Sequence, residues 1–271
     1  MDRRQQPGPV AGRATGPDEE RGRGDVEWPR EPELAWRDAT CDPMDDTSPV
    51  PVDGTVYVAH NNRPGTRVLP LNAAPAAADG TVFVPGGIGS ASLYALDASD
   101  GSVRWRTDIG GDGLSETPAV GPEAVCVADS TRRLLAVDRA TGAVRWTVDD
   151  FESPVRTPAI AGDRLHVGTR DHVRALTLDG EAVWKSSDVG TSGSIAVDDR
   201  RVYTSADNTP TALGADSGDA VWNAGVGERT SHAGPPVVAE TTVYVGRLGE
   251  RTDDGPQGTV FAFEKRSGDQ Q

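Results

Sequence analysis

Six short apolar segments recur along the chain at intervals of about 40 residues, and this repeat limits the possible folds more than any other feature. Each segment is a triplet rich in β-branched and aromatic residues, which favour strands. Successive triplets are separated by 26, 43, 40, 37 and 41 residues. The triplets are Val56-Tyr57-Val58, Val82-Phe83-Val84, Val125-Cys126-Val127, Leu165-His166-Val167, Val202-Tyr203-Thr204 and Val243-Tyr244-Val245. The chain is therefore predicted to fold as a series of similar units.

A proline stands seven positions before five of the six triplets, and each opens a short apolar run. Because proline lacks a backbone N–H, the start of a strand is one of the few places in a sheet that tolerate it. Each unit is therefore predicted to begin with a strand. The six positions are Pro49, Pro75, Pro118, Pro158, Ile195 and Pro236.

The second half of each unit repeats as well. A second apolar strand is followed by a polar turn with a glycine, and four residues after the glycine comes a tryptophan. Glycine provides the positive φ of a tight turn, and tryptophan provides a large apolar surface for packing against a neighbouring sheet. Four antiparallel strands per unit are predicted. The segments are Leu93–Asp97, Leu134–Asp138, Val173–Leu176 and Val260–Phe263, the glycines Gly101, Gly142, Gly180, Gly218 and Gly268, and the tryptophans Trp105, Trp146, Trp184 and Trp222.

About six four-stranded antiparallel sheets without helical periodicity predict an all-β fold, the β-propeller, because one such sheet cannot bury both faces alone. The sequence Tyr94-Ala95-Leu96-Asp97 followed by Gly101-Ser102-Val103-Arg104-Trp105 occurs again, in similar form, at 135–138 and 142–146. This pattern resembles the pyrroloquinoline-quinone-like propeller repeat over about residues 49–271. The resemblance implies one of two roles: a quinoprotein dehydrogenase, or a scaffold like the lipoprotein of the outer-membrane β-barrel assembly machinery.

The two ends of the repeat are irregular. The unit at 49–74 is too short for its tryptophan strand, and the chain ends before the last unit reaches its own. Trp36, in the segment Glu33–Arg37, precedes the first unit and carries the missing type of aromatic residue. We predict a propeller over 33–271 that is either incomplete or closed by a strand at 33–38. Residues 1–32, rich in Gly, Pro and balanced charges, are predicted to be disordered or loosely attached.

The net charge of −15 and a pI near 4.6 argue against nucleic acid as a partner, because the surface repels polyanions. The chain contains 29 Asp, 13 Glu and 25 Arg but only two lysines, Lys185 and Lys265. Such an Asp-rich surface stays hydrated when salt screens its self-repulsion. We therefore predict a halophilic protein of the haloarchaeal type, and measuring unfolding in low and in multimolar salt tests this. No apolar run long enough for a transmembrane segment is present.

No residue is predicted to be catalytic or to bind a metal, and no cofactor is expected. His166 and Cys126 occupy the middle of their triplets, where other units have Tyr or Phe, so both are predicted to be packing residues. His60, His172 and His232 are predicted to be solvated loop residues. Asp97, Asp100 and Asp138 are predicted to be turn formers rather than calcium ligands. Residues 86–89 form a glycine-rich hairpin loop that lacks the Lys-Ser/Thr of a phosphate loop.

One end of a propeller gathers the loops between second and third strands and the links between sheets, and ligands commonly bind there. Several arginines are predicted to lie on this loop face, where guanidinium groups bind carboxylates in a bidentate manner. The alternative is that they pair with neighbouring acids. The candidate residues are Arg63, Glu116, Arg132, Arg156, Arg170, Asp171, Asp207, Asn208, Arg229, His232 and Arg247.

The predicted function is a non-enzymatic scaffold, a monomer that presents its loop face to a protein or small ligand. A quinone- or metal-dependent oxidoreductase of the quinoprotein type is the alternative, although the chain lacks adjacent cysteines and has too few units. A sugar-active propeller enzyme is the third possibility. Because no apolar signal follows Arg3-Arg4, the sequence as written predicts a cytoplasmic location; a start lying upstream would instead allow export to the cell surface.

Overall fold

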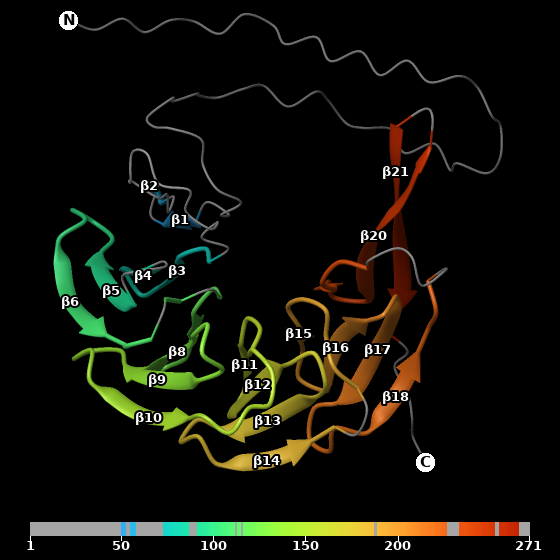
Figure 1. Ribbon diagram of the computed structural model, residues 1–271. Helices are drawn as coiled ribbons and strands as arrows, with labels where there is room; N and C mark the ends of the chain where they lie inside the picture. The colour runs from blue at the N-terminus through green and yellow to red at the C-terminus, as the bar shows by residue number, and fades with distance from the viewer. Residues whose placement is uncertain are drawn as a thin grey trace, which may run out of the picture. The chain divides into compact units, whose positions relative to one another are not determined.

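The computed structural model describes most of the chain from residue 50 onward (Figure 1). The described ranges are 50–52, 55–57, 73–86, 91–111, 113–114, 116–186, 189–226, 233–252 and 255–265. All regular structure in these ranges is β-strand. Within the unit Met44–Gln271, the strands form separate antiparallel sheets that follow one another in chain order.

Four of these sheets have four strands each, paired in sequence order, as the repeat predicts. The first comprises β3 (Ala76–Ala78), β4 (Thr81–Pro85), β5 (Ser92–Asp97) and β6 (Val103–Asp108). The second comprises β7 (Ala119–Val120), β8 (Ala124–Ala128), β9 (Leu134–Asp138) and β10 (Val144–Val148). The third comprises β11 (Ala159–Ala161), β12 (Arg164–Gly168), β13 (Val173–Thr177) and β14 (Ala182–Lys185). The fourth comprises β15 (Ala196–Val197), β16 (Arg201–Ala206), β17 (Thr209–Gly214) and β18 (Ala220–Asn223).

The terminal sheets are smaller in the described part of the chain. The first two strands, β1 (Val50–Val52) and β2 (Thr55–Tyr57), pair only with each other. The last sheet comprises β19 (Val237–Val238), β20 (Thr242–Thr252) and β21 (Gly255–Glu264), whose long hairpin exceeds the predicted strand length (Figure 1). The predicted closing strand at 33–38, with Trp36, and the segment 1–32 lie outside the described residues. Ring closure therefore stays a prediction.

The first strands of successive sheets, β1, β3, β7, β11, β15 and β19, lie side by side in that order. The hydrophobic core fills the spaces between neighbouring sheets, as stacked propeller blades require. One cluster joins Phe83 and Leu93 of the first four-stranded sheet to Val125 and Leu135 of the second. The prediction of an all-β propeller, complete over four sheets, is confirmed.

Each four-stranded sheet has two ends. The turn end holds the turns between first and second strands and between third and fourth strands. The loop end holds the loops between second and third strands and the links to the next sheet. In the second sheet the turn end is 121–123 and 139–143, and the loop end is 129–133 and 149–158.

The predicted tryptophan packing is confirmed at the turn end. Trp146 on β10 donates its indole N–H to the carbonyl of Leu178 in the next sheet, at 2.9 Å. A Cβ on Gly180 would lie 2.8 Å from the indole ring, so this turn needs glycine for close approach as well as for its φ of +87°. Trp105 and Trp184 make the same contacts with the turns that carry Gly142 and Gly218. The tryptophans therefore fasten each sheet to the following one.

A β-bulge directs these tryptophans. In all four sheets the pairing of third and fourth strands shifts by one residue just before the tryptophan. From the first to the fourth of these sheets, the extra residue is Arg104, Arg145, Val183 and Val221. Because a bulge increases local twist, it re-aims the following side chain.

Candidate functional site

The loop end brings together the two kinds of loop that were predicted to form a common face. Arg132 donates to the carbonyl of Glu152 at 3.2 Å, and Arg247 donates to the carbonyl of Val226 at 2.6 Å. Arg132 lies in the loop between β8 and β9, and Glu152 lies in the link that follows β10. Arg247 was predicted to be a loop residue, but it lies within β20 and pairs with Thr259, because this hairpin is longer than the others. One contact between a loop and a link is therefore observed, and the common ligand-binding face stays a prediction. Arg63, Arg229 and His232 lie outside the described residues.

Glu116 and Arg156 form a pair across two successive links. A guanidinium nitrogen of Arg156 lies 3.8 Å from a carboxylate oxygen of Glu116, and Thr157 donates its hydroxyl to the other oxygen at 2.6 Å. Burial raises the pKa of Glu116 above its ordinary value, although the bonds from Thr157 and Arg156 oppose this effect. The side chain of Arg156 is 42% exposed, so it remains open to solvent while one face is paired.

The loop of Arg170 and Asp171 is held firmly in place. The backbone N–H of Arg156 donates to the carbonyl of Gly168 at 2.8 Å, two residues before Arg170. Gly190 packs so closely on the carbonyl of Arg170 that no Cβ fits between them. Ser153 donates its hydroxyl to Asp171. Arg156 and the exposed Arg170 are therefore presented from adjoining, rigidly anchored loops.

Asp207 and Asn208, both predicted to lie on the loop face, are found in one tight turn at the loop end. They form a two-residue hairpin turn between β16 and β17, with φ of 45° and 61°. Two successive positive φ values are typical of a type I′ turn, in which Asp and Asn are favoured. Asn208 is 3% exposed, and its carbonyl accepts the N–H of Val226. Asn208 is therefore placed to shape the turn rather than to contact a ligand.

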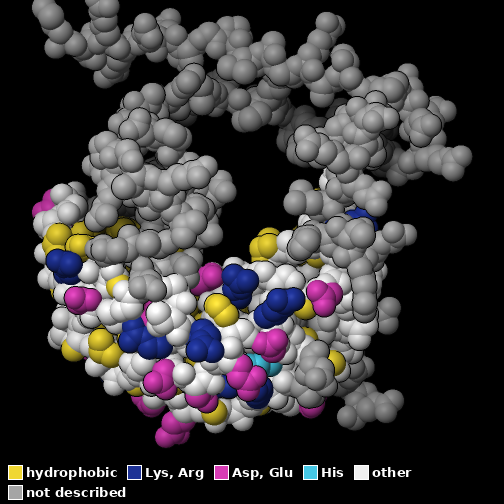
Figure 2. Space-filling model, in the orientation of Figure 1, with side chains coloured by type: hydrophobic (Ala, Val, Ile, Leu, Met, Phe, Trp, Pro, Cys, Tyr) yellow, Lys and Arg dark blue, Asp and Glu magenta, His cyan; other side chains and the backbone are white. Residues whose placement is uncertain are grey.

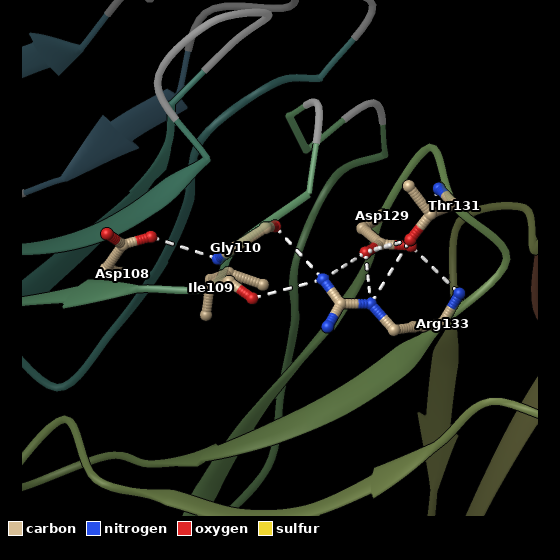
Figure 3. Close-up of polar contacts among 6 residues, drawn as sticks. All are labelled: Asp108, Ile109, Gly110, Asp129, Thr131 and Arg133. Atoms are coloured by element: carbon tan, nitrogen blue, oxygen red, sulfur yellow. Dashed lines mark hydrogen bonds and ion pairs between the residues drawn. The ribbon is translucent and has the colours of Figure 1, made fainter.

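Sequence reasoning missed a buried ion pair at the loop end (Figure 3). The carboxylate of Asp129 is fully buried and lies 2.7 Å from the guanidinium of Arg133. It also accepts the N–H and hydroxyl of Thr131. Arg133 donates further to the carbonyls of Ile109 and Gly110, in the link from the preceding sheet. The short polar loop 129–133 was visible in the sequence, but nothing there distinguished Asp129 from an ordinary turn residue.

The prediction that His172 is solvated is wrong. Its side chain is buried at 2% exposure, and Arg174 donates to its Nε2 at 3.0 Å. Burial, with the nearby positive charges of Lys185 and Arg174, lowers its pKa. Its position directly before β13 places it under the loop instead of on it. His60 and His232 lie outside the described residues.

The predicted packing roles of His166 and Cys126 are confirmed. His166 is 1% exposed, and its ring lies 5.8 Å from that of Trp184. Cys126 is equally buried, and burial raises the pKa of its thiol to about 12. Asp97, Asp100 and Asp138 accept backbone N–H groups two or three residues further on, as turn formers do.

In the described ranges, no group of three or more His, Cys, Asp or Glu side chains is placed to hold a metal ion. Those ranges also contain no helix with the length and hydrophobicity of a membrane span. On the face shown in Figure 2, cationic and anionic side chains are interspersed over the described surface. That face is therefore a mixture of positive and negative side chains rather than a uniformly charged surface.

The family model described as outer membrane protein assembly factor BamB matches residues 29–177 and 169–271. The chain belongs to this family. Proteins named outer membrane protein assembly factor BamB are 30% identical over 158 residues in Yersinia pestis and 34% identical over 125 residues in Shewanella oneidensis. These matches cover 51% and 43% of this chain but only 40% and 31% of the relatives. The chain thus spans less than half the length of these relatives.

Two solved structures share the fold. The crystal structure of BamB from Moraxella catarrhalis has a TM-score of 0.56 at 24% identity, covering 72% of this chain and 62% of that one. The computationally designed protein Ika8 has a TM-score of 0.60 at 15% identity, covering 70% and 57%. The resemblance to the pyrroloquinoline-quinone-like repeat is therefore confirmed at the level of family and fold.

The relatives also correct one prediction. Their name places those proteins at the outer membrane, whereas the sequence as written predicted a cytoplasmic location. The cytoplasmic prediction is therefore wrong. It relied on the absence of an apolar signal near Arg3-Arg4, and such an absence carries less information than family membership.

Proposed function

We propose that this protein is a non-enzymatic, cofactor-free scaffold of the cell envelope, which binds a partner protein through its loop end. The single observation behind this proposal is the placement of Arg156 and Arg170. Both are solvent-accessible, and both stand on loops whose backbones are fixed by bonds or close packing to neighbouring loops. Preorganised side chains lose little conformational entropy on binding, which favours recognition.

The two arginines favour an acidic partner segment. A guanidinium group binds a carboxylate with two parallel hydrogen bonds, and its planar fork is not reproduced by lysine. Glu116 occupies one side of Arg156 and so orients it. Membership of a family of assembly factors agrees with a binding role.

The test is capture of envelope proteins from the source organism with the purified chain as bait. We expect the double variant R156A/R170A to lose the captured partner, and R170K to bind more weakly than the unchanged chain. Arg200→Ala is the matched control, since this exposed arginine lies in the turn between β15 and β16 at the opposite end. Equal capture by R156A/R170A and R200A would show that the loop end is not the binding face.

Two further measurements test the remaining parts of the proposal. Absorbance and metal analysis of the purified protein should show no bound quinone and no stoichiometric metal; either finding would favour the oxidoreductase alternative. Fractionation of source cells with an antibody should place the protein in the envelope fraction. Recovery in the soluble cell interior alone would contradict an envelope scaffold.

A further inference from the structure

A cavity of about 250 Å³ opens between the second and third four-stranded sheets, at the turn end and thus opposite to the loop end. Its apolar wall is formed by Cys126 on β8, Ile160 on β11 and Leu178 in the turn before β14. Glu123, Arg145 and Asp179 form its rim. The cavity is smaller than the sites that usually hold nucleotides or other large ligands, about 300 to 1,000 Å³. It is larger than the cavity of about 150 Å³ that is known to take up benzene.

The cavity wall contains a small residue at a position where the other complete sheets have an aromatic ring. The middle residue of the second strand is Phe83, His166 or Tyr203 in the other complete sheets, and each ring packs against a tryptophan. Cys126 occupies this position in the second sheet. Its side chain is shorter than these rings and forms part of the cavity wall. The cavity therefore borders a position where other sheets place a ring.

A second replacement opens the cavity to solvent. Trp105 donates to the carbonyl of Arg139, and Trp146 donates to that of Leu178, so Arg139 and Leu178 hold equivalent positions. The guanidinium of Arg139 spans back to Asp79 of the preceding sheet, at 2.5 Å, and to the carbonyl of Gly121. Leu178 is shorter and uncharged, so the corresponding space at the next interface stays open.

The rim carries an excess of negative charge. Arg145 is held by Glu123 at 2.9 Å and lies 3.7 Å from Asp138, while Asp179 also lines the opening. One cation is therefore surrounded by three carboxylates. The whole chain carries a net charge of −15, so a positively charged segment is attracted to this surface.

We propose that this cavity is a docking site for a partner protein, which inserts one aromatic or branched apolar side chain while a neighbouring Lys or Arg meets the carboxylates of the rim. The inference rests on the proposed function as a protein-binding scaffold but concerns the opposite end of the sheets. The occupant replaces the ring that Cys126 lacks and takes the place that the guanidinium of Arg139 fills at the preceding interface. A single buried side chain with flanking charges is expected to bind with a Kd in the millimolar range as a short peptide.

The experiment is a titration of the methyl-labelled full chain with three blocked peptides, followed by the NMR shifts of the Ile160 and Leu178 methyl groups. The first peptide is Gly-Lys-Phe-Lys-Gly, the second has Ser in place of Phe, and the third has Glu in place of both Lys. We expect saturable shifts with the first peptide and binding at least about tenfold weaker with the other two. Absence of shifts with the first, or equal binding of the third, would overturn the proposal.

Two variants fill the cavity in different ways. Cys126→Phe supplies the ring found in the first sheet, and Leu178→Arg supplies the side chain found at the preceding interface. Both should abolish the shifts, and Cys126→Phe should also raise Tm by a few degrees because it fills a void. Cys126→Val is the matched control and should keep binding. If Cys126→Phe fails to fold, Leu178→Arg still decides the question; unchanged peptide binding by a folded Leu178→Arg variant contradicts the proposed site.

Titration with phenethylamine distinguishes a small-molecule ligand from a partner protein, because phenethylamine has the same ring and positive charge but no peptide backbone. Saturable binding of phenethylamine together with no binding of the Lys-Phe-Lys peptide would show a small-molecule site and overturn the proposal. The loop-end variants R156A/R170A should leave these methyl shifts unchanged. Failure of partner capture at the loop end and failure of peptide binding at the turn end are therefore distinguishable.

Discussion

At the turn end of the sheets a single contact recurs from one sheet to the next, whereas at the loop end each sheet makes a contact of its own. The recurring contact is the tryptophan that donates to a carbonyl in the next turn and covers its glycine. The individual contacts are the ion pairs Asp129–Arg133 and Glu116–Arg156 and the hydrogen bond between Arg174 and His172. The turn end thus holds neighbouring sheets together, and the contacts at the loop end differ from sheet to sheet, which agrees with the proposed binding role of that end.

Removing one tryptophan of the turn end is expected to have the largest effect. Trp146→Ala loses a hydrogen bond and the packing of the indole on Gly180. We expect a loss of about 3 to 5 kcal/mol in the free energy of unfolding, measured by chemical denaturation in high salt. The control Val144→Ala, at an exposed position of the same strand, should change it by less than about 0.5 kcal/mol. A loss below about 1 kcal/mol at Trp146 would mean that the recurring contact does not hold the sheets together.

Breaking the buried ion pair should have the next largest effect and tests whether the loop end contributes to stability. Asp129→Ala leaves Arg133 without its buried partner, and such a loss costs about 3 to 5 kcal/mol when both groups are buried. Because the side chain of Arg133 is 29% exposed, we expect about 2 to 3 kcal/mol. Asp163→Ala removes an ion pair of the same 2.7 Å length whose carboxylate is 81% exposed, and it should cost less than about 1 kcal/mol. Equal losses for the two variants would contradict a stabilising role for the loop-end pair.

Two glycines separate the backbone requirement of the turn from the packing of the tryptophan. Gly101 and Gly180 have similar φ values, +73° and +87°, but no described atom lies within 4 Å of a Cβ on Gly101. Gly101→Ala should therefore cost only the strain of the left-handed conformation, about 1 to 2 kcal/mol. Gly180→Ala adds a clash with Trp146 and should cost at least about 1 kcal/mol more in the same denaturation experiment. If both variants lose the same free energy of unfolding, Trp146 moves away from the added methyl group without any loss of stability.

Titration of two carboxyl groups is expected to give the smallest effect, with opposite signs at the two ends. The hydroxyl and the N–H of Thr141 hold the pKa of Asp138 below its ordinary value, so its contribution to stability is present above that value and is lost as the pH falls. Burial raises the pKa of Glu116, so its contribution is present at low pH and is lost as the pH rises through the raised pKa. NMR titration of the side-chain carboxyl carbons should place the two midpoints on opposite sides of the ordinary values, and midpoints on the same side would contradict this difference between the ends.

Much of the turn end was predictable because its contacts repeat. In the four complete sheets, glycine with positive φ in the turn between third and fourth strands and tryptophan four residues later lie where the sequence placed them. The alignment of triplets also identified Cys126 and His166 as packing residues. The same alignment showed that Cys126 stands where other units have a ring, although the cavity that follows from this required the neighbouring sheet to be seen. The halophilic interpretation, a monomeric state and a closing strand at 33–38 stay predictions.

The loop end was predictable only as a region. Its candidate residues were chosen by position in the repeat, and position does not tell which side chain is buried or paired. His172 was expected to be solvated, yet it lies under its loop and accepts a bond from Arg174. Asp129 and Arg133 were not singled out, yet they join two sheets.

By itself, the sequence determined the fold class, the strand order and the tryptophan contacts, because these depend on local pattern and on repetition: a unit that recurs must bury the same surface against each neighbour. Only the tertiary structure decided the cavity beside Cys126, the pairing of Glu116 with Arg156 and the burial of Asp129. These depend on which side chains of two different units meet at one interface. Such contacts join residues about 40 positions apart in the chain. They cannot be inferred from the sequence pattern within one unit.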